Sequence, residues 1–139
     1  MPVNCNHLRS SLVGLIGFAR NPWLRGRQLW LQIVVRGFWH PLGHVGEYYL
    51  EHGQSDRALA LHAHAVATAR YLDAPPQACG MAVYSLACIE ARLGLLDESA
   101  ANVRSAVALN ADLREKAASD PDLIALRTVA SVWLDRLTP

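Results

Sequence analysis

The stretch that decides the fold is YSLACIEARLGLLDESAANVRSAVALN, residues 84–110, because its spacing of small residues occurs twice in the chain. Its landmarks fall at intervals of three, four, five and seven residues: Ala87, Glu90, Gly94, Ser99 and Ala106. The same intervals occur 41 residues earlier at Gly46, Tyr49, Gly53, Ala58 and Ala65. An internal repeat of this length is typical of stacked helical units.

Each copy is interpreted as two helices joined at a glycine. Gly53 and Gly94 are expected to end the first helix of each copy, since glycine adopts the left-handed backbone conformation without strain. The second helices are predicted to start at Ser55-Asp56 and Asp97-Glu98, with side-chain oxygens capping free N–H groups. Pro75-Pro76 is expected to separate the two copies.

The pattern resembles the tetratricopeptide repeat (TPR). The TPR signature places a small residue, a Tyr, a hairpin Gly and two later Ala residues in this order. The first copy keeps all five, whereas the second has Glu90 in place of Tyr and Ser99 in place of Ala. The period of 41 residues exceeds the family's period of about 34. The resemblance implies an all-α, right-handed stack of antiparallel helical hairpins with about 6–8 helices.

Residues 110–139 are predicted to close this stack. Asp112 and Glu115 are interpreted as a capping box, and Asp120-Pro121 as a second helix start. A last amphipathic helix is indicated by apolar residues at helical spacing: Leu123, Leu126, Ala130, Trp133, Leu134 and Leu137. The chain is thus expected to be one domain, with two TPR-like repeats at 40–109 and closing helices at 110–139.

Residues 1–39 are predicted to form an apolar helical hairpin, with helices at 7–20 and 27–39. The second of these helices is apolar on nearly all sides, so it should be buried on most of them. Leu31, Val35 and Trp39 form a stripe that a monomer would leave in water, which predicts a homodimer through this hairpin. The five Arg residues of the segment are expected to be solvated or to pair with acids of the C-terminal half; the alternative is a basic patch for an acidic partner or a lipid head group.

The composition limits the classes of protein. A chain of 139 residues with 52% hydrophobic residues can bury a core. Its net charge of +1 gives no overall reason to expect nucleic-acid binding. No apolar run reaches the length of about 18 residues that spans a membrane. Three Cys residues without pair or metal spacing favour a reducing, cytoplasmic location.

A histidine pair offers an alternative in a different class of protein. His40 and His44 are one helical turn apart, which is a metal-ligand spacing. Two predicted helices followed by Trp-His-Pro-Leu-x-His, residues 39–44, also resemble the closing half of the DinB-like (damage-inducible) four-helix bundles. That resemblance implies a divalent metal held by His40 and His44, with a third ligand from His7 or a partner chain.

The main hypothesis is a protein-interaction or scaffold module without catalytic residues or cofactors, because no phosphate loop, metalloprotease motif or nucleophile triad occurs. In a TPR stack, the first helix of each hairpin lines the concave face. A protein or peptide partner is therefore expected at His40, Glu47, Leu50, Glu51, Met81, Tyr84, Ser85, Cys88 and Arg92. The acids among them favour basic residues in the partner.

Overall fold

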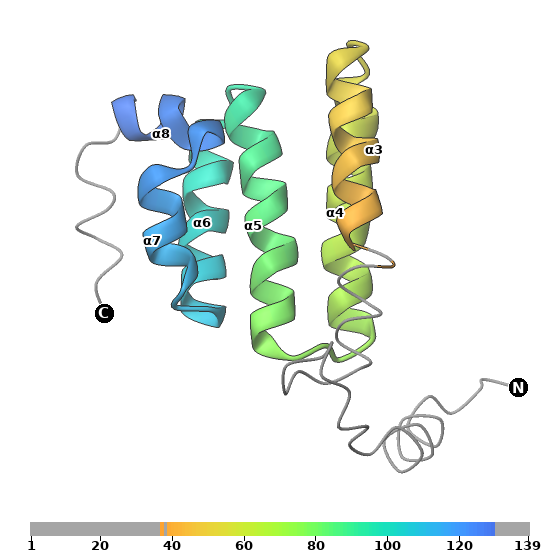
Figure 1. Cartoon of the computed structure of the whole chain (residues 1–139), viewed down its shortest axis with the longest axis vertical. Coiled ribbons are helices and arrows are strands. Elements are labelled where there is room, and N and C mark those ends of the chain that lie inside the picture. The colour runs from red at the N-terminus through yellow and green to blue at the C-terminus, as the bar shows by residue number, and fades with distance from the viewer. Residues whose placement is uncertain (1–36, 38, 130–139) are drawn as a thin grey trace, which may run out of the picture. The chain divides into compact units, whose positions relative to one another are not determined.

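The computed structural model describes residue 37 and residues 39–129, and every regular element within them is helical (Figure 1). These elements are α3 His40–Glu51, α4 Ser55–Tyr71, α5 Pro76–Arg92, α6 Leu96–Leu109, α7 Leu113–Ser119, the 3₁₀ helix η3 Pro121–Leu123 and α8 Ile124–Val129. The predicted all-α class is confirmed for this part of the chain. The chain divides into units of residues 1–40 and 41–139, and the helices described above lie in the second unit, apart from the first residue of α3.

The two predicted hairpin glycines end helices α3 and α5. Gly53 has a φ of +68° and Gly94 a φ of +78°, which is the left-handed region that glycine adopts without strain. The backbone N–H groups next to the two glycines donate equivalent hydrogen bonds. Gln54 donates to the Tyr49 carbonyl at 2.8 Å and Leu95 to the Glu90 carbonyl at 2.9 Å. Residues 41 positions apart therefore form the same turn. The prediction that Gly53 and Gly94 end a helix is confirmed.

The helix starts lie close to the predicted positions, but the predicted side-chain caps are wrong. Helix α4 begins at Ser55 after the N-cap Gln54, and α6 begins at Leu96 after the N-cap Leu95. Neither N-cap residue forms a side-chain capping hydrogen bond. Asp56 and Asp97 instead lie within the first turn, where a negative charge stabilises the helix through its dipole. The break at Pro75-Pro76 is confirmed, since α4 ends at Tyr71 and α5 begins at Pro76.

The small residues of both copies lie in the core. Gly46, Ala58, Ala65, Ala87, Ser99 and Ala106 are all buried. Ser99, which replaces the expected Ala, donates a hydrogen bond from Oγ to the Ala87 carbonyl of α5 at 2.8 Å. The buried hydroxyl is therefore satisfied, and the two helices still approach closely.

The two copies differ in the side-chain volumes at one contact between their helices. Gly46 of α3 lies against the buried imidazole of His62 on α4. The positions 41 residues later carry Ala87 and Val103, which are both fully buried. One copy therefore combines glycine with a large side chain, and the other combines alanine with a smaller one.

Glu90, which replaces the expected Tyr, is a buried carboxylate between α5 and α6. Only 7% of the residue is exposed, and Asn102 Nδ2 donates to its two carboxylate oxygens at 2.9 and 2.8 Å. Burial raises the pKa of Glu90, the Asn102 hydrogen bonds oppose this shift, and nearby Glu98 adds to it. One neutral amide compensates a buried negative charge only in part.

We therefore expect Glu90→Gln to raise the melting temperature at pH 7.5 by about 2–5 °C. The raised pKa means that Glu90 binds a proton more readily in the folded chain than in the unfolded chain, so the destabilisation caused by this carboxylate decreases as the pH falls toward 4.5. The difference in melting temperature between Glu90→Gln and the wild type should therefore decrease from pH 7.5 to pH 4.5. Thermal unfolding followed by circular dichroism measures it. The exposed Glu115→Gln is the control, and an equal gain in that variant would contradict the assignment.

The C-terminal helices agree with the sequence only in part. The predicted capping box of Asp112 and Glu115 is wrong, because Asp112 has helical backbone angles and caps nothing with its side chain. Its own N–H donates instead to Asn110 Oδ1 at 3.3 Å. The start at Asp120-Pro121 is confirmed: the Asp120 side chain accepts the Asp122 N–H, and Pro121 opens η3.

Several further predictions concern the two ends of the chain. Leu123 and Leu126 are buried, as a closing amphipathic helix requires, whereas residues 130–139 lie outside the described part. The predicted hairpin of residues 1–39 lies outside it almost entirely, and its homodimer stays a prediction. Of the dimer residues, Trp39 is partly buried, while Leu31 and Val35 are outside. In the described ranges, no helix is both long and apolar enough to cross a bilayer.

Candidate functional site

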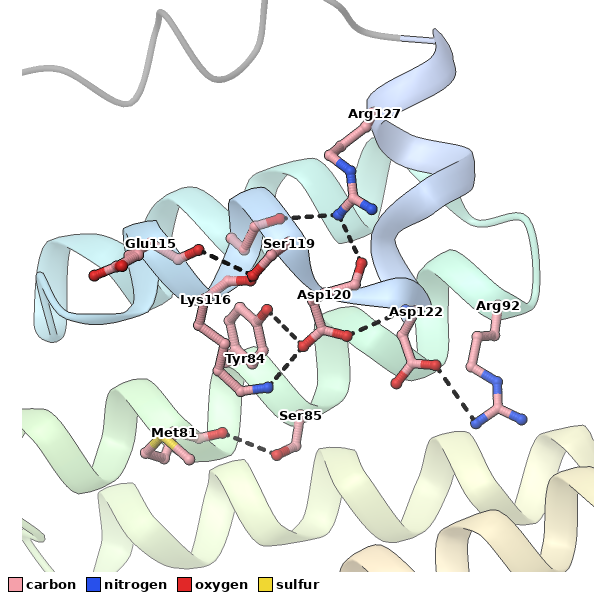
Figure 2. A network of polar contacts seen from close by, with 11 residues as sticks. Met81, Tyr84, Ser85, Arg92, Glu115, Lys116, Ser119, Asp120, Asp122 and Arg127 are labelled. Carbon is pink, nitrogen blue, oxygen red and sulfur yellow. Dashed lines mark hydrogen bonds and ion pairs between the residues drawn. The ribbon is translucent and has the colours of Figure 1, made fainter.

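A network of polar side chains joins α5 to the segment between α7 and α8, with Asp120 at its centre (Figure 2). Asp120 Oδ2 accepts hydrogen bonds from Tyr84 Oη at 2.9 Å and from Lys116 Nζ at 2.7 Å. Asp120 Oδ1 accepts the backbone N–H of Asp122 at 3.1 Å. Arg127 donates to the Asp120 carbonyl at 2.6 Å and to that of Ala117 at 3.0 Å. One acidic residue thus fixes the end of α7, the start of η3 and the contact with α5.

The charges in this network follow from these contacts. Burial acts to raise the pKa of Asp120, but the hydrogen bonds from Lys116, Tyr84 and the Asp122 N–H outweigh it, so that this pKa is lowered. The pKa of Tyr84 is raised, first by burial and then by Cys88 and Asp120. Tyr84 therefore remains a neutral donor and Asp120 an anion at neutral pH, which suits a structural bond better than acid–base chemistry.

Three potential metal ligands meet beside this network. Cys88, Asp120 and Asp122 have their ligand atoms within 4.8 Å of one another, and this is the one such group of three in the part of the chain that the structure describes. Burial, with the Asp120 and Asp122 carboxylates, raises the pKa of the Cys88 thiol to about 12. A metal ion binds the thiolate, and Asp120 is already satisfied by its other partners. The donor set therefore fits a metal ion poorly.

The histidine pair gains no third ligand from the described residues. His40 and His44 are exposed on α3, and no His, Cys, Asp or Glu from residues 37 and 39–129 completes a group of three with them. His7, the other candidate ligand, lies outside these residues. The DinB-like alternative stays a prediction.

A second set of charges, here named the Arg92 cluster, consists of Arg92, Glu47, Glu51 and Asp122. Arg92 of α5 donates from one guanidinium nitrogen to both carboxylate oxygens of Glu47 on α3 at 2.6 Å. Asp122 lies 4.0 Å from the same nitrogen, and the field of Glu51 also acts on Arg92. Two carboxylates, of Glu47 on α3 and Asp122 on η3, therefore lie beside one cation, and Glu51 adds to the negative field, so the cluster has an excess of negative charge.

Asp122 is an acid whose charge the Arg92 cluster compensates only in part. Burial raises its pKa, Arg92 opposes the shift, and the carboxylates of Asp120 and Glu47 add to it. Its side chain is 39% exposed, so a ligand in solvent can reach it. An additional cation placed beside Asp122 would relieve this repulsion.

The structure brings some of the predicted partner-binding residues together and separates others. Glu47 and Arg92 form an ion pair in the Arg92 cluster, and Glu51 acts on Arg92 through its charge. Tyr84 and Cys88 are buried, with exposed fractions of 2% and 8%, because η3, α7 and α8 contact α5. A partner could reach the remaining residues, all exposed or partly exposed: His40, Leu50, Met81 and Ser85.

Sequence reasoning missed Asp120, Asp122 and Lys116 as members of a site. The Asp-Pro-Asp triplet at 120–122 indicated a helix start, and the cap is confirmed. The hydrogen bond between Asp120 and Tyr84 joins residues 36 positions apart, and no periodicity in the sequence connects them.

Comparison of the chain with protein-family models, with curated proteins and with solved structures gives no significant match. The function is therefore inferred from the residues and their geometry alone.

Proposed function

We propose that the chain is a protein-interaction module of TPR type, which binds a basic segment of a partner protein on the surface formed by α3 and α5. The observation that carries the proposal is the Arg92 cluster, where carboxylates from two separate parts of the fold, Glu47 and Asp122, lie beside one guanidinium in the additional field of Glu51.

The TPR part of the proposal rests on positions 41 residues apart. The hairpin glycines share a positive φ, and the small residues of both copies share burial. These are the properties that a stack of equivalent helical hairpins requires. In such a stack α3 and α5 would be the first helices of successive hairpins, and their common face would be the concave one.

The choice of partner rests on charge. Residues 41–129 carry seven Lys and Arg against eleven Asp and Glu. The Arg92 cluster likewise has more acidic than basic side chains. Electrostatic complementarity selects a basic partner and accelerates its association. Met81 of α5 is 38% exposed and offers an adaptable apolar contact beside the polar Ser85. A Lys- or Arg-containing segment with an apolar residue fits these features.

The test is binding of the intact chain to an array of peptides that differ in net charge. Lys- and Arg-containing peptides are expected to bind, and Glu47→Gln with Asp122→Asn should weaken the best of them by about 3–10-fold at 0.15 M salt. Affinity should also fall as salt rises, because these charges are partly exposed. Fluorescence anisotropy measures both effects.

The matched control removes two acids of α6, through Asp97→Asn with Glu98→Gln. It changes the net charge by the same amount, so it separates a local site from the overall charge of the chain. A change below about twofold is expected in this control. Equal losses in both double variants, or no preference for basic peptides, would reject the proposal.

A further inference from the structure

His62 is a buried titratable residue at the contact between α3 and α4. The residue is 6% exposed, and its Nε2 has no hydrogen-bond partner. This nitrogen lies against Gly46 of α3, in the space that a Cβ atom would otherwise occupy. His64, two residues later on the same helix, is exposed.

The contact accepts a neutral imidazole but not a protonated one. A protonated ring carries a full charge and N–H donors on both nitrogens, and the Nε2 donor would face the backbone of α3 without an acceptor. We propose that His62 makes the docking of α3 on α4 sensitive to acid: protonation of His62 releases α3, while the helices from α5 onward stay folded.

The direction of this effect follows from the surroundings of His62. Burial lowers the pKa of His62, and the carboxylate of Glu47 on α3 opposes the shift without reversing it. From α5, which also packs on α4, Arg92 holds Glu47 in their ion pair. The docked state therefore binds fewer protons than the released state, in which the pKa returns toward 6.5. Docking weakens as the pH falls below about 6.5, by at most about tenfold per pH unit.

Release of α3 would also change the Arg92 cluster. Glu47 and Glu51 belong to α3, so Arg92 would lose both and keep Asp122. The acidic excess would disappear, and a basic partner would dissociate at low pH. This consequence rests on the proposed function, whereas the release itself does not.

The experiment is hydrogen–deuterium exchange of the intact chain at pH 7.5 and 5.5, with exchange times corrected for the intrinsic effect of pH. In the wild type, amides of α3 are expected to lose protection by about 3–10-fold at pH 5.5, relative to those of α5 and α6. The double variant Gly46→Ala with His62→Val carries the residue types found at positions 87 and 103. Its α3 amides should keep their protection at pH 5.5. His64→Gln should behave as the wild type.

Equal protection of α3 at both pH values in the wild type, or equal losses in the double variant, would overturn the proposal. If the double variant does not fold, NMR titration of the His62 ring in the wild type gives the answer. A ring that titrates at or above pH 6.5 while α3 remains docked would also overturn it. Neither measurement uses a peptide, so failure of the partner proposal would leave both results unaffected.

Discussion

Asp120→Ala is expected to lower the free energy of unfolding by about 2–4 kcal/mol at pH 7.5. The change leaves the buried Tyr84 hydroxyl without its acceptor and removes the cap of η3. The Lys116 contact adds little, since the Lys116 side chain is 52% exposed and solvent screens the pair. Urea unfolding of the intact chain, followed by circular dichroism, measures the loss.

A double-mutant cycle with Tyr84→Phe separates the contribution of the Tyr84–Asp120 hydrogen bond from the other contacts of Asp120. Tyr84→Phe alone should cost about 1 kcal/mol, because Asp120 keeps Lys116 and the Asp122 N–H. In the double variant no hydroxyl is left unpaired, so the combined loss should be smaller than the sum of the two single losses. Additive losses would show that the Tyr84–Asp120 hydrogen bond is not the source of the effect.

The contribution of Asp120 should also depend on pH. Its pKa is lowered from the usual 3.8, so the stabilisation is present above that pH and is lost as the pH falls below it. The difference between wild type and Asp120→Ala should therefore narrow in acid.

Gly46→Ala is expected to cost about 1–2 kcal/mol, although alanine favours a helix. The new Cβ would overlap His62 Nε2 and lie 3.0 Å from its Cδ2, so the imidazole or α3 must move. Thermal and urea unfolding measure the loss.

A second substitution should reverse this loss. In the double variant Gly46→Ala with His62→Val, the contact takes the residues of the other copy, Ala87 and Val103, which pack fully buried. Stability at pH 7.5 should return to the wild-type value or exceed it, because the helix propensity improves and no buried imidazole remains. A double variant that is less stable than Gly46→Ala alone would contradict the equivalence of the two copies.

Local features of the fold could be predicted from the sequence because their causes are local. Gly53 and Gly94 end helices through their own backbone freedom, and Pro76 opens one through its fixed φ. The predicted side-chain caps failed for two local reasons. Asp56 and Asp97 lie two positions after the N-cap residues Gln54 and Leu95, and Asp112 stands at the N-cap position with helical backbone angles and forms no capping hydrogen bond.

The candidate site was harder to predict because its members come from distant segments. The spacing placed Glu47 and Arg92 on a common face, and their ion pair joins residues 45 positions apart. The same spacing gave no sign that η3 and α7 would cover Tyr84 and Cys88 on α5. That covering depends on the length and direction of the closing helices, which periodicity within one helix does not specify.

The most direct measurement is a backbone NMR footprint of the intact chain with the best basic peptide from the array. The proposed function predicts the largest shift changes at Glu47, Glu51, Met81, Ser85, Arg92 and Asp122, with little change at the exposed α6 residues Ala101, Arg104 and Ser105. Shift changes confined to α6, or spread evenly over the molecule, would contradict binding on the surface of α3 and α5.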